Sequence, residues 1–124
     1  MSRLFDSTIL ISHLRGDERA TQQLLEAAGP GPLASVISRA EIEGGMRSSE
    51  REGVARLFEG LALIPVTDAI VRRAGAELRA FRRSHSGIDL ADYLIAATAL
   101  EHGLELVTLN VRHFPMFGGL EAPW

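Results

Sequence analysis

The chain has 124 residues, of which 46% are hydrophobic, and it carries a net charge of −3 without a single cysteine. Its length and apolar content fit one domain spanning residues 1–124. The lack of cysteine excludes disulfides, thiolate chemistry and cysteine-based zinc sites, and no run of about 18 apolar residues is present to cross a membrane. The first residues enter a strand-like pattern without a targeting segment, so we expect a cytoplasmic protein.

The basic residues are all arginine, because the thirteen positive side chains include no lysine. Arginine binds phosphates and carboxylates through its planar fork, but coding bias toward arginine explains the same composition. A net charge of −3 argues against a protein that coats nucleic acid by bulk electrostatics. Composition therefore neither supports nor excludes a nucleic-acid substrate.

The first part of the chain contains two apolar runs that predict buried strands. Residues 3–6 form the first run, and the start of a helix follows it. Residues 17–28 have helical spacing and end at the turn sequence GPGP. Residues 33–37 form the second strand, after which Ser38 is a candidate N-cap with Glu41 in the capping-box position.

The rest of the chain alternates helices with two more strands. Thr67 or Asp68 is expected to cap the long amphipathic helix of this part. Short apolar strands that alternate with helices predict an α/β fold, a three-layer α/β/α sandwich around a central, mostly parallel sheet. The predicted elements are a helix at 50–61, a strand at 62–66, helices at 68–85 and 90–103, a strand at 104–110 and a loop-rich tail.

Four carboxylates lie near the junctions between predicted strands and helices. Asp6 ends the first strand, Glu41 lies in the helix after the second, and Asp89 and Asp92 begin the helix before the fourth. Ligands of open parallel sheets gather beyond the carboxyl ends of the strands, so we expect these acids at one edge. Oxygen ligands are those that Mg2+ prefers. The pattern therefore predicts a divalent-metal site.

Three of the four acids also have a structural alternative. Asp89 can serve as an N-cap, Asp92 can lie in the first helical turn, where a negative charge is favourable, and Glu41 can complete the capping box. Asp6 has no routine structural role, because a carboxylate within an apolar segment is costly to bury unless its charge is offset. The joint placement of the four acids favours a functional site.

Other candidate groups carry weaker signals. The four histidines have no metal-ligand spacing and are expected at the surface or at its boundary. Ser7 and Thr8 lack an obvious histidine base, which makes them poor nucleophile candidates.

Four stretches of the chain, in their order, resemble the PIN-domain ribonucleases, specifically the VapC-type toxins of bacterial toxin–antitoxin pairs. They span nearly the whole chain, and the third is the most specific. The stretches are FDSTILI, SVISRAEIEGGMR, GIDLADYLIAATALEHGLELVTLN and VRHFPMFGGL.

The resemblance implies a PIN-like fold with a catalytic metal site. By this resemblance Asp6, Glu41 and Asp92 are the catalytic acids and ligands of Mg2+ or Mn2+, and Asp89 is an additional metal-binding acid present in some members of the group. The family often has an aspartate in the loop after the last long strand, where this chain has the neutral Asn110. The fourth ligand and a second metal therefore stay open.

The resemblance also implies a reaction and partners. It implies metal-dependent endonucleolytic hydrolysis of RNA, a homodimer, and inhibition by a cognate antitoxin whose C-terminal segment enters the acidic groove. We assign Asn110 and Thr8 to places beside the metal ligands or the substrate. Arg39, Arg47 and Arg112 are candidates for phosphate contacts at the rim, with solvated helix-face charge as the alternative.

Two other functions fit part of the pattern. A catalytically weak binding module would retain the PIN fold and pair with a partner helix. Retention of three acids argues against this alternative, and the missing acid at position 110 keeps it open. A Mg2+-dependent phosphatase of the haloacid-dehalogenase type also opens with an acid on its first strand. That phosphatase would need an aspartate in place of Thr8 and a lysine, which this chain lacks.

Overall fold

The computed structural model of the chain describes residues 2–27 and 29–124, and its centre is a sheet of four short strands. The strand order is β3-β2-β1-β4, and every neighbouring pair is parallel. Because all strands run in the same direction, their carboxyl ends meet at one edge of the sheet. The strands are β1 (Arg3–Phe5), β2 (Leu33–Ser35), β3 (Ala62–Ile64) and β4 (Glu105–Val107).

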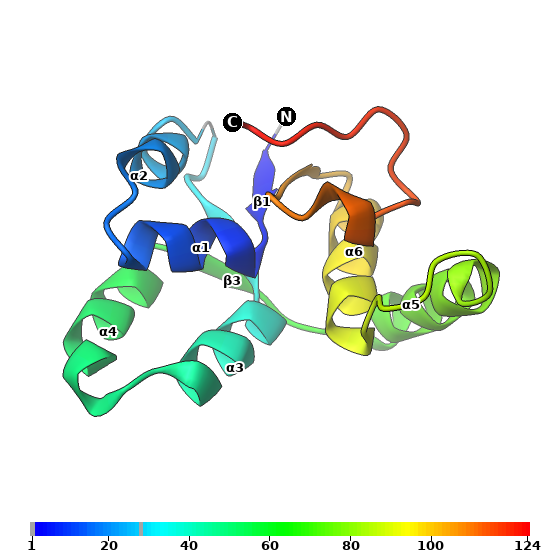
Figure 1. Cartoon of the computed structure of the whole chain (residues 1–124), viewed down its shortest axis with the longest axis horizontal. Coiled ribbons are helices and arrows are strands. Elements are labelled where there is room, and N and C mark those ends of the chain that lie inside the picture. Colours follow the sequence, from blue (N-terminus) through cyan, green and yellow to red (C-terminus); the bar gives the residue numbers. More distant parts are fainter. Residues whose placement is uncertain (1, 28) are drawn as a thin grey trace.

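Within the described residues, six α-helices and two short 3-10 helices surround the sheet. In Figure 1, α1 to α4 lie on one side of the strands, and α5 and α6 lie on the other. This arrangement confirms the predicted three-layer α/β/α sandwich. The helices are α1 (Ser7–Leu14), α2 (Glu18–Leu25), α3 (Val36–Gly45), α4 (Arg51–Glu59), α5 (Asp68–Phe81), α6 (Leu90–His102), η1 (Ser48–Glu50) and η2 (Val111–His113).

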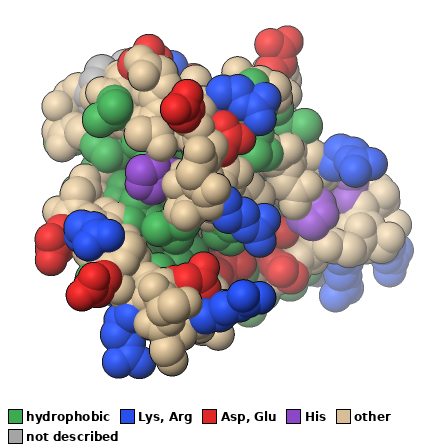
Figure 2. Space-filling view, turned by 60° about the vertical axis from the view of Figure 1, so that its left-hand side comes forward, with side chains coloured by type: hydrophobic (Ala, Val, Ile, Leu, Met, Phe, Trp, Pro, Cys, Tyr) green, Lys and Arg blue, Asp and Glu red, His purple; other side chains and the backbone are tan. Residues whose placement is uncertain are grey.

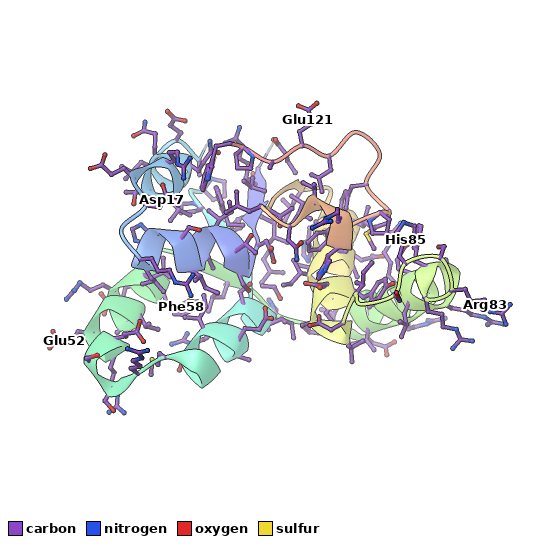
Figure 3. The ribbon with its side chains drawn as sticks, viewed as in Figure 1. Asp17, Glu52, Phe58, Arg83, His85 and Glu121 are labelled. Carbon is purple, nitrogen blue, oxygen red and sulfur yellow. The ribbon has the colours of Figure 1, made fainter. Side chains whose placement is uncertain are left out.

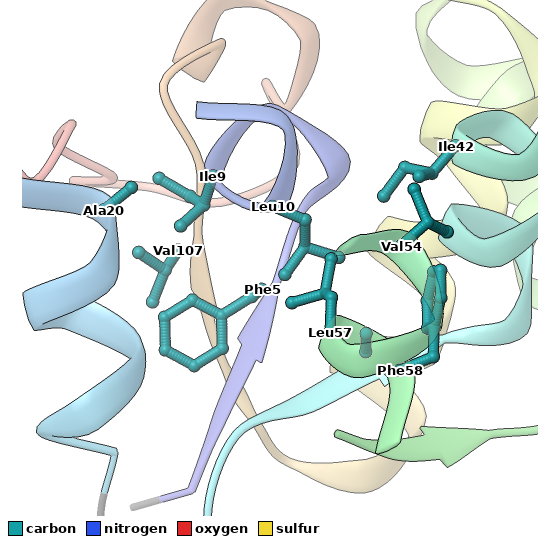
Figure 4. Packing of buried hydrophobic residues seen from close by; sticks show 10 residues of the cluster. Phe5, Ile9, Leu10, Ala20, Ile42, Val54, Leu57, Phe58 and Val107 are labelled. Carbon is teal, nitrogen blue, oxygen red and sulfur yellow. The ribbon is translucent and has the colours of Figure 1, made fainter. Parts of the chain in front are cut away.

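Alternate residues of the strands belong to two apolar clusters, one on each face of the sheet. Phe5 and Val107 pack with residues of α1 to α4, as Figure 4 shows. Leu4 and Leu106 are also paired neighbours, and they pack on the opposite face against α6 and Phe114. Successive side chains of a strand point to opposite faces, so three-residue strands suffice to join both layers.

Helix α3 begins at a different residue from the one that the sequence predicts. The predicted strand at 33–37 ends already at Ser35, whose side chain accepts a hydrogen bond from the backbone N–H of Ile37 and so caps α3. Ser38 therefore is not the N-cap, and the capping box with Glu41 is wrong. Ser38 lies inside α3 and is fully buried.

The other predicted elements are present with shorter bounds, except that the helix expected to continue over 50–61 is interrupted after α3 and begins again through η1 and α4. The first strand ends at Phe5, so Asp6 lies directly after it, at the N-cap position of α1. Thr67, rather than Asp68, caps α5. The predicted helix at 17–28 corresponds to α2, and its last residue, Ala28, lies outside the described residues.

The fifth helix is an outlying element that rests on α6. Ile70 and Ala74 of α5 are buried against Tyr93 and Ala97 of α6, and Figure 1 shows α5 standing away from the strands. Of the helices in the described part of the chain, none is long and apolar enough to cross a membrane.

Candidate active site

Asp6 is a buried carboxylate at the carboxyl end of the central strand β1. Only 3% of the residue is exposed. Two hydroxyl groups donate hydrogen bonds to the same oxygen, Oδ2, from Thr108 Oγ1 at 2.7 Å and from Thr8 Oγ1 at 2.9 Å. The charge of Asp6 is therefore partly offset by directed dipoles, which lowers the cost of its burial.

The two threonines also fasten the loop that follows β4. Thr108 Oγ1 accepts a hydrogen bond from the backbone N–H of Asn110 at 3.0 Å, and Thr8 Oγ1 accepts one from the N–H of Leu109 at 3.1 Å. The loop after β4 and the start of α1 are thus joined through Asp6. Among the described residues, none forms a hydrogen bond with the side chain of Asn110.

Glu41 lies one turn into α3 from Ser38 and is held by the serine that follows Asp6. Ser7 Oγ donates to Glu41 Oε1 at 2.7 Å and lies 2.9 Å from the buried Ser38 Oγ. Partial burial and the negative charges of Asp6 and Asp89 raise the pKa of Glu41, against the opposing effect of the Ser7 hydrogen bond. The capping-box position that the sequence suggested for Glu41 is therefore replaced by a contact between two helices, α1 and α3.

Asp92 comes to the same edge from the other side of the sheet, in the first turn of α6. Its side chain is 14% exposed, and its Oδ2 lies 2.8 Å from His113 Nδ1. An ionised carboxylate only accepts hydrogen bonds, so the imidazole ring donates from Nδ1. Burial raises the pKa of Asp92 to about 6, with the charges of Asp89 and Asp6 adding to the rise and the His113 hydrogen bond opposing it.

Asp89 is the N-cap of α6, which was its structural alternative. Its Oδ1 accepts the backbone N–H of Asp92 at 3.0 Å, and the residue is exposed. Its charge nevertheless raises the pKa of both Glu41 and Asp92. The cap therefore also contributes to one negative field that all four acids share.

A common pattern links Asp6, Glu41 and Asp92. One oxygen of each carboxylate is held by a hydroxyl or an imidazole group. No described residue donates a hydrogen bond to the other oxygen of any of the three. Within residues 2–27 and 29–124, however, no three Asp, Glu or His side chains lie close enough together to hold a metal ion. The carboxylates share an edge without forming a closed cluster.

The structure thus places the acids that the sequence suggested along one edge of the sheet, with Thr8 and Asn110 next to Asp6. It adds Ser7, Thr108 and His113, which the sequence-based assignment left out of the site. The signal for Ser7 and Thr108 was present, because each is a small polar residue at the carboxyl end of a buried strand. His113 had no comparable signal, since its contact with Asp92 spans 21 residues.

The arginines proposed for the rim have different surroundings. Arg39 forms an ion pair with Glu43, and its guanidinium group lies 5.0 Å from the centre of the Phe58 ring. These contacts favour the structural alternative for Arg39. Arg112 is exposed in η2, and Arg47 lines a groove beside Glu41.

A groove of about 510 Å³ opens beside Glu41, between α1 and the helices α3 and α4. Both apolar and charged side chains line it. The apolar lining residues are Ile11, Leu14, Ile42, Met46 and Val54, and the charged ones are Arg15, Glu41, Arg47 and Glu50. A segment with both apolar and charged side chains would match this mixed lining.

Comparisons with known proteins agree with one another on the family. The family model of the PIN domain matches residues 3–117. Ribonuclease VapC10 of Mycobacterium tuberculosis is 53% identical over 122 residues, which cover 98% of this chain and 92% of that protein. Ribonuclease VapC19 of the same organism is 43% identical, with 98% and 99% covered.

The solved structures include a toxin–antitoxin complex from Klebsiella pneumoniae. A chain of that complex is 31% identical, has a TM-score of 0.81, and the match covers 99% of this chain and 98% of that one. VapBC2 from Rickettsia felis, 20% identical with a TM-score of 0.77, shares the fold. This chain therefore belongs to the PIN-domain family, among its VapC-type members.

Proposed function

We propose that this chain is a metal-dependent endoribonuclease and the toxin of a toxin–antitoxin pair. The observation that carries the proposal is the arrangement of Asp6, Glu41 and Asp92, each with one oxygen held by the protein and the other without a protein donor. The names of the curated relatives and the toxin–antitoxin complex among the structural relatives support the same function.

The donor set fits a divalent cation such as Mg2+ or Mn2+. All the donors are carboxylate oxygens, which these hard cations prefer, and ligating carboxylates are commonly hydrogen-bonded through their other atoms. Asp6, Glu41 and Asp92 would hold the cation, with Asp89 as an alternative fourth acid. When bound, the cation would supply a water of lowered pKa and neutralise charge on the phosphate.

The protein groups around the acids then have defined tasks. Thr8 and Thr108 hold Asp6, Ser7 holds Glu41, and His113 holds Asp92, so the carboxylates do not have to be ordered when the substrate arrives. Without a cation the acids would repel the RNA backbone. Thr8 and Asn110 would face a substrate group or a metal-held water, and the neutral amide of Asn110 would add no repulsion.

The groove beside Glu41 is the proposed contact with the antitoxin. An amphipathic antitoxin segment would place apolar side chains on Ile42 and Met46 and carboxylates against Arg15 and Arg47. Because Glu41 itself lines the groove, an occupant would block the acids. We further propose a homodimer, and a cytoplasmic location because the RNA substrate is found there.

The alternatives make different use of the same residues. A phosphatase of the haloacid-dehalogenase type would need an acid where Thr8 donates to Asp6, and it would need a lysine. A non-catalytic module would have no reason to leave three carboxylate oxygens without protein donors. The nuclease therefore explains more of the site than either alternative.

The test is RNA cleavage by the purified chain with Mg2+ or Mn2+, and with a chelator. Asp6→Asn keeps the shape of the side chain and removes its charge, so we expect cleavage to be lost while the circular dichroism spectrum is retained. Glu52→Gln, an exposed acid on α4, is the matched control and should cut normally. Cleavage by Asp6→Asn would remove Asp6 from the site, and a folded wild type that cuts no RNA with either metal would favour the binding module.

A further inference from the structure

Charge is unevenly distributed between α5 and the rest of the chain. Residues 68–85 contain five arginines against two acids, a net charge of +3. The remaining residues contain eight arginines against fourteen acids, a net charge of −6. Figure 2 shows Arg and His side chains gathering on the part of the molecule that recedes at the right, where α5 lies. The acidic protein thus carries one basic element.

The basic side chains of α5 lie on its outer face. Arg72 and Arg79 are seven residues apart, two turns of an α-helix, and so share one side. Arg82 and Arg83 continue from the end of the helix, and all four are exposed. Figure 3 shows Arg83 projecting from the outer end of this element. We call Arg72, Arg79, Arg82 and Arg83 the α5 basic face.

No carboxylate of a described residue lies within 4.0 Å of these four guanidinium groups. Arg73, on a neighbouring side of the helix, forms an ion pair with Glu101 of α6 at 3.0 Å. None of the arginines of the α5 basic face forms an ion pair with a described residue. Three small exposed residues of the helix leave the surface around the guanidinium groups open, namely Gly75, Ala76 and Ala80.

The helix that carries the α5 basic face is joined to the helix of Asp92 by a short segment and by packing. The segment after α5 leads through residues 84–88 to Asp89, which caps the helix that carries Asp92. α5 itself packs on that same helix, α6. A ligand that binds both the basic face and the acids would therefore contact two helices that are packed against each other.

We propose that the α5 basic face binds the phosphate backbone of the RNA, beside the segment that is cut. This proposal rests on the proposed ribonuclease function. A polyanion gains nothing from the four acids of the site, so its affinity must come from positive charge elsewhere, and unpaired arginine forks bind phosphate in two-point contacts. The small neighbours on the outer face suit a backbone that lies along the helix, and contacts of this kind position RNA without reading its sequence.

The experiment compares three pair substitutions, each of which removes two positive charges. R72Q/R79Q and R82Q/R83Q change the α5 basic face, and R51Q/R56Q is the matched control on exposed positions of α4. All are made in the Asp6→Asn background, and binding of a fluorescent mixed-sequence single-stranded RNA is measured by anisotropy over a range of salt concentrations. The same pairs are made in the active protein for kinetics.

Each basic-face pair should lower the slope of log affinity against log salt by about 1.4, since each lost phosphate contact on a single strand contributes about 0.7. In the active protein KM should rise several-fold while kcat stays within about twofold, because the pairs leave the acids untouched. The control pair should leave the slope and KM unchanged.

Several outcomes would overturn the proposal. Equal slopes for the basic-face and control pairs, in a protein that still cuts RNA, would remove α5 from the RNA contact and leave the ribonuclease function standing. A change of oligomeric state in light scattering, or weaker antitoxin binding, with an unchanged RNA slope would assign the face to a second copy or to the antitoxin. A wild type that neither binds nor cuts RNA would overturn both proposals.

Discussion

The two sides of the sheet hold their acids in different ways. On the side of α1 to α4, Asp6 and Glu41 are fixed by hydroxyl groups of residues that are mostly buried, next to a broad apolar cluster. On the side of α6, Asp92 is held by one imidazole ring whose side chain is 35% exposed. The site therefore spans both sides of the sheet. We call the side of α1 to α4 the rigid side, because mostly buried hydroxyl groups hold its two carboxylates, and the side of α6 the adjustable side, because its single donor is partly exposed.

This difference between the hydrogen-bond donors indicates which of the three acids depends most on pH. The hydroxyl donors of Asp6 and Glu41 cannot change their charge at any ordinary pH. Asp92 has a pKa raised to about 6, so its protonation changes close to neutrality. Four predictions test this contrast, in order of decreasing expected effect.

The largest effect is expected from the charge of Asp92 in the metal-free protein. The folded pKa is raised above the ordinary value of 3.8 to about 6, so the folded state holds its proton more tightly than the unfolded state. Stability is therefore lost as pH rises through the window between about 4 and about 6. Asp92→Asn removes this cost, which is on the order of 2–3 kcal/mol.

Urea unfolding with a chelator measures this effect. Asp92→Asn should be more stable than the wild type at about pH 8, and the difference should disappear near pH 4. Glu52→Gln serves as the exposed control. A difference that stays constant with pH would show that the charge of Asp92 is not its cause.

The second prediction concerns the rigid side. Thr108→Val keeps the volume of a fully buried residue but removes the donor to Asp6 and the acceptor of the Asn110 N–H. We expect a loss of about 1–3 kcal/mol of stability together with a strong loss of RNA cleavage.

Thr98→Val is the matched control for this substitution. Thr98 is also fully buried, but its hydroxyl only donates to a backbone carbonyl of its own helix, that of Leu94. Thr98→Val should lower the free energy of unfolding by about 1 kcal/mol or less and leave RNA cleavage intact. Equal loss of cleavage in both variants would mean that Thr108 acts through packing alone.

The third prediction concerns the adjustable side and uses the identity of the donor atom. His113 donates from Nδ1, and the amide nitrogen of Asn occupies nearly the same place, whereas that of Gln corresponds to Nε2. His113→Asn should therefore retain Mn2+ affinity, and His113→Gln should lose about tenfold to a hundredfold, as for partners of ligating groups elsewhere.

Calorimetric Mn2+ titration distinguishes the two His113 variants, and the exposed His85→Asn is the control. If Asn and Gln at position 113 behave alike, the hydrogen bond to Asp92 has no positioning role.

The smallest effect is expected at Asn110. Asn110→Asp adds a negative charge beside Asp6 and should tighten Mn2+ binding by about tenfold or less, the scale of one added charge in a solvated site. Asn110→Ser is the neutral control. An unchanged Mn2+ affinity would show that residue 110 does not face the cation.

Much of this architecture follows from sequence pattern, and the exceptions have physical causes. The apolar runs around Phe5 and Val107 predict buried strands, because a parallel strand that is covered by helices on both faces is apolar along its length. The end of β2 was misplaced because Ser35 and Ser38 are both acceptable caps. The pairing of Ser35 with Ile64 in the neighbouring strand decides between them.

The site was predictable to the extent that it follows strand ends. Asp6 and the acids of α3 and α6 reach one edge because parallel strands end there. The contact of His113 with Asp92 depends on the turn of η2 and on the burial of Phe114, and local sequence patterns do not fix such a geometry. The hydrogen bond from Thr108 to Asp6 joins residues 102 positions apart, so a local sequence pattern cannot predict it either.

That long separation has a consequence for the newly made chain. Chains are synthesised from the N-terminus at roughly 5–20 residues per second, so Asp6 leaves the ribosome on the order of ten seconds before Thr108, its hydroxyl donor. The central strand β1 likewise waits for β4 to complete its pairing. A chain of this fold is therefore unable to assemble its acids until its synthesis is almost finished, and a nascent toxin cannot cut RNA while most of it is still being made.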